Sequence, residues 1–407
     1  MKRLHYGWVM VFSAMAIFAV NSQPFYSFGI FLRTMTGELK WERGAMSLAL
    51  SITMLVSNPL SILTGRLSDK YGPRVLVTAS GVAYGAAYLL MSQIHTLWQL
   101  YLIWGILISA GGALCSVPLT STIPRWFAKR RSMALGLTYA GMTFGGIVGP
   151  FLTQWIINRY DWRWAYAVFA GMTLIVYLPL AQLLKKSPHD SGLKPYGETE
   201  EGTATMEAAQ GFSYRQALRS RWFWLFGGIL VCQFFIGQTL VSHIAPHVID
   251  LGFSATTGAS LLSIYAATSL IGTNLSGILI ERIGLRRMVL ASFILIVLML
   301  VWLLFSRAEW MFYAFAVIYG TLFGLLIPLQ TVAPSEFFGL KSLGSISATM
   351  MFIGAIGGAI GSPLAGAIYD SRGNYQLAFL ICIGLGVAAV VLSVFLLRSA
   401  KEEMPRA

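Results

Sequence analysis

The stretch Gly65-Arg-Leu-Ser-Asp69-Lys70-Tyr-Gly72-Pro-Arg74 separates two long apolar runs of the sequence. Gly72 permits a sharp turn because glycine adopts positive φ without steric cost. Gly65 would let two helices approach closely, and Asp69 can face a helix N-terminus or a basic side chain. Lys70 and Arg74 would face an anionic lipid surface. The stretch therefore predicts a tight polar turn between two apolar helices.

The composition of the whole chain extends this interpretation. Its 407 residues are 56% hydrophobic and only 11% charged, whereas soluble domains are about 45–50% apolar and about 25% charged. Soluble multidomain, secreted disulfide-rich, disordered and fibrous proteins are excluded, and a polytopic membrane protein is predicted. The net charge of +13 is attributed to cytoplasmic loops rather than to a nucleic-acid partner.

Twelve apolar runs are long enough to span a bilayer, which takes roughly 20 residues each. They begin near Gly7, Ala45, Val75, Trp98, Ser132, Trp164, Trp222, Gly258, Met288, Met311, Leu343 and Gln376. A polar segment over residues 185–221 follows the sixth run. We expect an all-α fold with a six-helix bundle over 1–184, a cytoplasmic linker over 185–221 and a second six-helix bundle over 222–407.

The basic residues predict the orientation in the membrane. If both termini lie inside, only seven of the 29 Lys and Arg residues face outward, and the other 22 face inward. The outer seven are Arg33, Lys40, Arg43, Arg159, Arg163, Arg307 and Arg372. Because basic loops stay on the cytoplasmic side, this bias predicts a cell-membrane protein with cytoplasmic N- and C-termini.

The chain repeats itself at a shift of 212 positions, the distance from Gly65 to Gly277. At this shift Asp69 matches Glu281, Lys70 matches Arg282, Gly72 matches Gly284, Arg74 matches Arg286, Gly145 matches Gly357 and Gly149 matches Gly361. One shift that holds over so long a stretch predicts two parallel six-helix repeats. Transporters built in this way rock about a central site near the membrane midplane, where we expect the substrate.

The polar turn resembles the signature loop of the major facilitator superfamily, and residues 277–286 lie where that family has a second, weaker copy. The resemblance implies that both loops act as inner gates. Gly145, Gly149 and Pro150 resemble the fifth-helix Gly-Pro motif of many exporters. The plainer interpretation is close helix packing through small residues, which we also expect at Gly357 and Gly361.

Three local stretches resemble bacterial relatives of monocarboxylate transporters and oxalate/formate antiporters. They are Tyr6-Gly-Trp8, Phe25-Tyr-Ser-Phe-Gly-Ile-Phe31 and Arg125-Trp-Phe127 with the following Arg130-Arg-Ser-Met-Ala-Leu-Gly136. The resemblance implies carboxylate substrates. Three basic residues of those families are missing: the corresponding positions hold or lie near Thr273, Met350 and Tyr26. Substrate charge would then be met by hydrogen bonds and water, or the substrate differs.

Polar side chains within the runs are the remaining candidates for substrate binding. The repeat pairs Asn21 with Gln233. The full candidate set is Asn21, Tyr26, Ser116, Tyr139, Gln233, Gln238, His243, Thr273, Asn274 and Gln330. Each could instead bond one helix to another. His243 and His247 could take up protons or guide anions, or could lie at the interface. No metal ligand set, cofactor or disulfide pattern is expected.

We expect a secondary active or facilitative transporter of a small organic acid that works by alternating access. A proton could be co-transported. The alternative is efflux of apolar or aromatic compounds, and an integral-membrane enzyme is a remote third possibility. The expected partners are the substrate and the lipid bilayer, and the expected state is a monomer.

Overall fold

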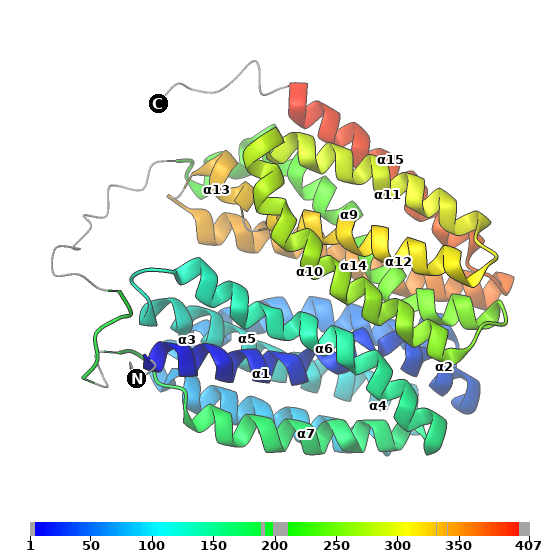
Figure 1. Cartoon of the computed structure of the whole chain (residues 1–407), viewed down its shortest axis with the longest axis horizontal. Coiled ribbons are helices and arrows are strands. Elements are labelled where there is room, and N and C mark those ends of the chain that lie inside the picture. The colour runs from blue at the N-terminus through cyan, green and yellow to red at the C-terminus, as the bar shows by residue number, and fades with distance from the viewer. Residues whose placement is uncertain (1–4, 189–191, 198–210, 331, 340, 399–407) are drawn as a thin grey trace. The chain divides into compact units, whose positions relative to one another are not determined.

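The computed structural model describes residues 5–188, 192–197, 211–330, 332–339 and 341–398. These residues form helices and their connections (Figure 1), and the described part of the chain has no β-strand beyond two isolated bridges. Eleven described helices are long and apolar enough to cross a membrane. The predicted all-α membrane fold is confirmed.

The chain forms two compact units. The first comprises residues 1–41 and 48–204, and the second comprises 42–47 and 205–407. The first unit holds α1 (Tyr6–Tyr26), α2 (Phe28–Leu39), most of α3 (Arg43–Met91), α4 (Leu97–Leu100), the π-helix η1 (Tyr101–Ile108), α5 (Ser109–Thr122), the 3-10 helix η2 (Ile123–Trp126), α6 (Arg131–Arg159) and α7 (Trp162–Gln182). The second holds α8 (Tyr214–Arg219), α9 (Arg221–Asp250), α10 (Ala255–Ile283), α11 (Leu285–Phe305), α12 (Glu309–Leu326), the 3-10 helix η4 (Ile327–Gln330), α13 (Val332–Phe338), α14 (Leu343–Arg372) and α15 (Gln376–Arg398).

Helix α3 contains two of the twelve predicted spans. Its backbone leaves the helical region at Gly72, where φ is 77° and ψ is 170°. A side chain at this φ would be strained, so glycine makes the predicted sharp turn possible. The early part of α3, Arg43–Ser57, is a shorter apolar helix, which together with the eleven longer ones accounts for the twelve predicted runs. The predicted close approach at Gly65 is absent, because an added Cβ there would meet only Val117 at 3.9 Å.

The first helix of each repeat packs closely on a glycine-rich helix. An added Cβ at Gly145 of α6 would lie 2.1 Å from the Ala19 carbonyl oxygen of α1. The second unit repeats this contact between α9 and α14, where a Cβ at Gly357 would lie 2.1 Å from the Val231 carbonyl oxygen. Both partners are related by the shift of 212 positions. The repeat in the sequence is therefore also a repeat of helix packing.

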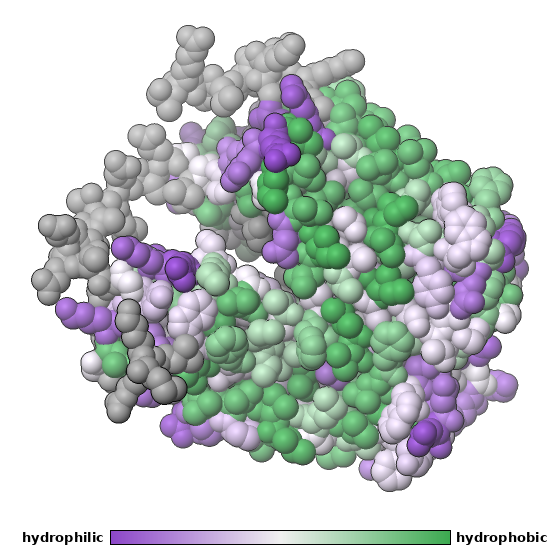
Figure 2. All heavy atoms as spheres, in the orientation of Figure 1, coloured by the Kyte–Doolittle hydropathy of each residue, from purple (hydrophilic) through white to green (hydrophobic). Residues whose placement is uncertain are grey.

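The surface of the bundles is apolar. Figure 2 shows wide green areas of hydrophobic side chains on the face in view, and large side chains within spans point outward. Ile175 of α7 is 74% exposed and Ile62 of α3 is 65% exposed. Soluble monomers rarely expose contiguous apolar patches of more than a few hundred Å², so these side chains are suited to contact lipid.

Part of the polar connection after α7 packs on the first unit. The Tyr196 amide donates to the Trp126 carbonyl oxygen at 2.8 Å, and the Tyr196 ring lies against Trp8 and Phe127. The side chain of His5 bonds to the Lys194 carbonyl. Residues 192–197 are thus anchored on the start of α1 and on η2.

Candidate functional site

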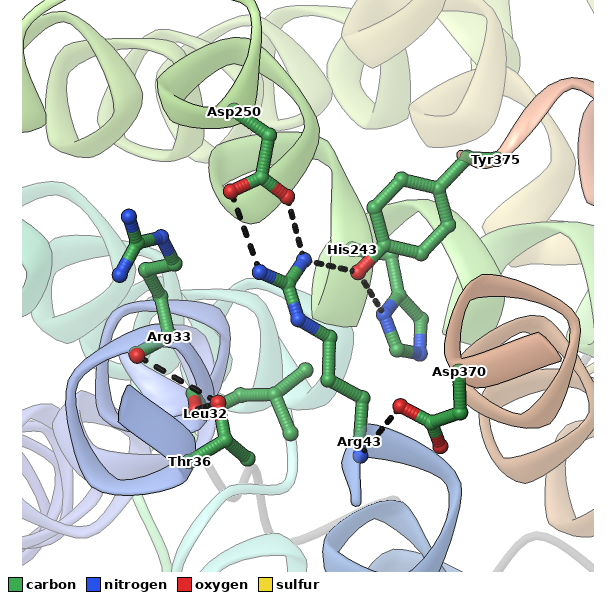
Figure 3. Close-up of polar contacts among 8 residues, drawn as sticks. All are labelled: Leu32, Arg33, Thr36, Arg43, His243, Asp250, Asp370 and Tyr375. Atoms are coloured by element: carbon green, nitrogen blue, oxygen red, sulfur yellow. Dashed lines mark hydrogen bonds and ion pairs between the residues drawn. The ribbon is translucent and has the colours of Figure 1, made fainter. Parts of the chain in front are cut away.

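A buried polar cluster centres on Arg43, at the first turn of α3. Arg43 Nη1 donates to Asp250 Oδ2 at 2.6 Å, and Nη2 donates to Oδ1 at 3.1 Å (Figure 3). Its guanidinium also lies 3.7 Å from the centre of the Tyr369 ring. The Arg43 side chain is only 8% exposed. This is a buried, bidentate ion pair, the geometry in which arginine binds a carboxylate most strongly.

Within the second unit, a series of hydrogen bonds leads from Arg43 to α9 and α14 (Figure 3). Arg43 Nη1 donates to the Tyr375 hydroxyl at 2.7 Å, and that hydroxyl lies 3.1 Å from His243 Nδ1. His243 Nε2 lies 2.8 Å from the Ser362 carbonyl oxygen. Since a carbonyl oxygen can only accept, Nε2 carries the imidazole proton. Nδ1 then accepts from the Tyr375 hydroxyl, so each donor in this series of hydrogen bonds meets an acceptor.

The electrostatic environment agrees with Tyr375 as the donor and His243 as the acceptor. Burial raises the pKa of the Tyr375 phenol, and Arg43 opposes that effect, so Tyr375 keeps its proton and can donate it. His243 is completely buried, and its ring lies against that of Tyr375. In the described arrangement His243 is a neutral acceptor closed off from solvent.

Asp370 of α14 holds the backbone at the start of α3. Its two carboxylate oxygens accept from the amides of Arg43 at 2.9 Å and Gly44 at 2.8 Å. Free amides and the helix dipole favour an anion at a helix N-terminus. An added Cβ at Gly366 would lie 2.5 Å from the Gly44 nitrogen, so glycine permits this contact. Residues 42–47 are consequently part of the second unit.

Sequence reasoning missed Arg43, Asp250, Asp370 and Tyr375 as functional candidates. Arg43 was only one of seven predicted outer charges. The repeat carried an unused signal, because the shift of 212 positions matches Glu38 with Asp250 and Arg163 with Tyr375. In the first unit Glu38 accepts from Arg163 at 2.6 Å.

Trp162 also donates to Glu38 at 2.7 Å. These hydrogen bonds, led by that from Arg163, lower the pKa of Glu38. In the second unit tyrosine replaces the arginine, and Arg43 supplies the cation that Asp250 binds.

The predicted binding residues of the first unit are not gathered into one cluster. The Asn21 amide donates to the Tyr177 hydroxyl at 2.9 Å, and Tyr177 lies 3.6 Å from Cys115. Ser116 bonds to its own helix at Gly112. The Tyr26 ring lies edge-on to Phe25, and Tyr139 stacks on Phe18. Of this set, Asn21 joins α1 to α7.

Most candidates of the second unit donate hydrogen bonds either within their own helix or to backbone carbonyls of α12. The Gln233 amide donates to the Leu326 carbonyl at 3.3 Å, and Gln238 donates to Ser242 at 3.4 Å. Thr273 donates to Ser269 and Gly324, and Asn274 donates to Leu270. Gln330 lies in η4.

Two glutamine oxygens remain unused. Gln233 Oε1 and Gln23 Oε1 are buried and accept no hydrogen bond from the described residues. A buried acceptor without a donor is costly, so these oxygens can bind a polar ligand or water. Gln23 was not among the predicted candidates: the repeat pairs Asn21 with the polar Gln233 but pairs Gln23 with the apolar Phe235.

The first signature loop forms contacts at its polar positions. Arg125 donates to Asp69 at 3.2 Å, and Lys186 donates to the Asp69 carbonyl. Arg74 Nε donates to Gln182 at 2.6 Å, and Lys70 lies 5.0 Å from the Tyr71 ring centre. The Asp69–Arg125 pair is largely exposed. It therefore contributes little to stability, which leaves it free to form and break.

The second loop is built differently. Gly284 has a φ of 82° between α10 and α11, as Gly72 does in the first loop. Arg286 lies over the rings of Trp222 and Phe337, with its guanidinium 4.8 Å from the centre of Phe337. Gly277 meets open space, and Glu281 and Arg282 lie in the last turns of α10.

The other predicted packing positions, Gly149 and Gly361, contact Gln23 and Phe235 closely, and Pro150 lies inside α6.

The described residues hold no group of three or more metal-ligating side chains. The chemistry available to the clusters above is hydrogen bonding and charge pairing.

Known proteins resemble this chain over nearly its whole length. The Major Facilitator Superfamily matches residues 7–361, with a second match over 231–407. Monocarboxylate transporter 13 of Rattus norvegicus is 27% identical over 378 residues, which cover 92% of this chain and 85% of that protein. Agnestins efflux protein AgnL12 of Paecilomyces divaricatus is 23% identical over 341 residues, covering 83% and 73%.

The fold is similar to that of a bacterial homolog of the human lysosomal transporter Spinster, solved in an inward-facing and unoccupied conformation. The TM-score is 0.78 at 15% identity, and all of both chains is covered. With the glycine-mediated helix contacts found in both repeats and the family match over most of the sequence, the chain belongs to the Major Facilitator Superfamily and is a multi-pass membrane transporter of that family.

Proposed function

We propose that this transporter carries a small organic acid across the membrane by alternating access. The observation that carries the proposal is the similarity to monocarboxylate transporter 13 over 92% of the chain. The acid crosses together with a proton or by exchange. A protonated acid avoids the cost of an ion at the bilayer centre, about 2.5–3.5 kcal/mol on insertion scales.

The polar groups of the two repeats support an uncharged form of the substrate. Asn21 and Gln233 are amides at matching positions of the two first helices. Gln233 Oε1 and Gln23 Oε1 are buried acceptors without a donor among the described residues. Such an oxygen can accept a hydrogen bond from the O–H of a carboxylic acid, whereas it would repel the oxygens of a carboxylate. We therefore propose Asn21, Gln23 and Gln233 as substrate-binding residues.

A binding experiment tests this proposal. Purified protein is heated in detergent with lactate, pyruvate, oxalate, aromatic acids or neutral aromatics at several pH values. We expect one class of acid to raise the Tm, more strongly at low pH, and Gln233→Leu to remove most of the shift. Gln93→Ala, at an exposed position, is the control and keeps it. A shift with neutral aromatics alone contradicts the organic-acid proposal.

Efflux of aromatic compounds is the second candidate, favoured by the similarity to the Agnestins efflux protein. Cells that express the protein would then survive higher concentrations of a toxic aromatic compound than cells with an empty vector. Equal survival across a panel of such compounds contradicts this candidate.

The orientation of the chain is also a proposal, with both termini in the cytoplasm and the signature loops on the inner side. It rests on the bias of basic residues. Tyr160→Cys, at an exposed position after α6, should react with an impermeant maleimide in intact cells, while Leu193→Cys should react only after permeabilisation. The reverse pattern contradicts the proposed orientation.

A further inference from the structure

A polar cavity lies within the second unit, beside the Arg43 cluster. It is formed by the end of α9, the connection between α11 and α12, and the connection between α14 and α15. Its volume is about 100 Å³. Drug-sized ligands occupy pockets of roughly 300–1,000 Å³, whereas a cavity of about 10–15 Å³ is enough to hold one water. The cavity therefore has room for several waters or for a ligand of a few heavy atoms.

The unpaired charge that faces this cavity is positive. Arg307 lines it and has no carboxylate partner among the described residues. Its Nη1 donates to the carbonyl oxygens of Leu304 and Ser306, and these bonds fix the guanidinium. Asp250 also lines the cavity, but both of its oxygens accept from Arg43, which neutralises its charge.

His247 adds a second donor to the cavity wall. Its ring is held edge-on by Phe379 at 5.0 Å, by Tyr375 at 5.9 Å and by Phe312 at 6.1 Å. No hydrogen bond to its ring nitrogens is found among the residues that the structure describes. An imidazole that is held by aromatic rings and keeps its nitrogens unused can bind a ligand in the cavity.

Asn374 and Gln376 add exposed polar side chains at the rim, and the remaining walls are apolar or aromatic. Tyr369, Tyr375 and Phe379 contribute rings, and Leu303 and Leu304 contribute aliphatic surface. An inorganic anion would leave this surface without a contact. A short-chain organic acid matches both parts, since its carboxylate can bind Arg307 in a bidentate manner while its carbon chain covers the rings and leucines.

We propose that this cavity is a peripheral binding site for a small organic anion, with Arg307 and His247 as the residues that bind the carboxylate. The site belongs to the second unit alone and is distinct from the residues proposed above for transport. It exists whether or not the protein transports the same acid. A ligand in it lies against Asp250 and Tyr375, the two side chains that hold the Arg43 guanidinium.

Cysteine protection tests the site directly. Cys115, Cys232 and Cys382 are buried, so a thiol introduced by Gln376→Cys at the exposed rim of the cavity is the reactive one. Purified protein is labelled with N-ethylmaleimide in the presence of propionate or of its neutral analogue propionamide, at constant ionic strength. We expect millimolar propionate to slow labelling at least severalfold and propionamide to have no effect. Asn374→Cys, at a second lining position, should behave in the same way.

The binding residues are tested in the same reporter. Arg307→Gln should raise the propionate concentration needed for protection at least tenfold, and Arg307→Lys should restore part of the effect. Arg159→Gln, which removes an arginine in the first unit, is the matched control and should change nothing. Tyr160→Cys should show no protection.

Two results would overturn the proposal. One is equal protection by propionamide, which would mean that charge is irrelevant. The other is a failure of the expected protection pattern, seen either as unchanged protection in the Arg307→Gln variant or as no protection at either cysteine. Neither result depends on transport, so failure here leaves the organic-acid transport proposal to its own experiment.

Discussion

Arg43 shows how a single residue can join a short piece of chain to a unit that is distant in sequence. Its side chain binds Asp250 and Tyr375, and its backbone amide binds Asp370. The charge was visible in the sequence, but its burial was not, because it depends on partners more than 200 positions away. Local patterns predict which elements form, while pairings over such distances are set by tertiary packing.

Removing the carboxylate of this pair should be costly. Asp250→Asn leaves the buried Arg43 guanidinium without its counter-charge, and breaking a buried pair costs about 3–5 kcal/mol. We expect a clear fall in Tm in detergent. Asp69→Asn, which breaks the exposed pair with Arg125, is the control, with an expected loss of about 0–1 kcal/mol. Equal Tm values for the two variants contradict the role given to Arg43.

Glu38 should make the stability of the first unit depend on acid. The hydrogen bond from Arg163 lowers its folded-state pKa, so its contribution is present above the unfolded-state pKa and is lost as the pH falls through the folded value. Thermal unfolding should show Glu38→Gln below wild type at pH 7 and the difference shrinking toward pH 3. Glu42→Gln, at an exposed position, should give no such pattern, and a difference independent of pH contradicts the argument.

At the scale of the helix, the sequence predicted more of the structure than it did for single residues. The twelve runs, the turn at Gly72 and the paired repeats follow from local composition and periodicity. The glycines at 145 and 357 were expected to pack helices, and both lie against the carbonyl of a first helix. The sequence could not show that the side-chain oxygens of Gln23 and Gln233 remain unbonded, because this depends on the neighbours that packing gives each amide.

One helix offers a matched pair of glycines for testing this packing. Gly357→Ala in α14 places a Cβ 2.1 Å from the Val231 carbonyl oxygen, whereas at Gly344 of the same helix nothing lies within 4 Å. Overpacking costs about 1–3 kcal/mol, so Gly357→Ala should lower the Tm. Gly344→Ala should leave it equal or slightly raise it, because alanine favours the helix. Similar losses in both variants contradict the contact.

At the scale of the whole molecule, the exposed Asp69–Arg125 pair is a candidate for movement during transport. Asp69→Asn should slow transport severalfold while the Tm and substrate binding change little, because an exposed pair contributes little to stability. Initial rates in proteoliposomes, corrected for the amount of inserted protein, give the measurement. Normal rates in this variant remove the gating role from the first signature loop.

The central claim is transport of a small organic acid, and uptake by the reconstituted protein tests it most directly. Proteoliposomes are loaded at neutral pH, diluted into acidic buffer and given radiolabelled lactate or pyruvate. We predict uptake above that of empty liposomes, stimulated by the inward proton gradient or by unlabelled acid on the inside, and lost in Gln233→Leu. Uptake equal to empty liposomes for every acid of the panel, with protein that remains folded, would contradict the claim.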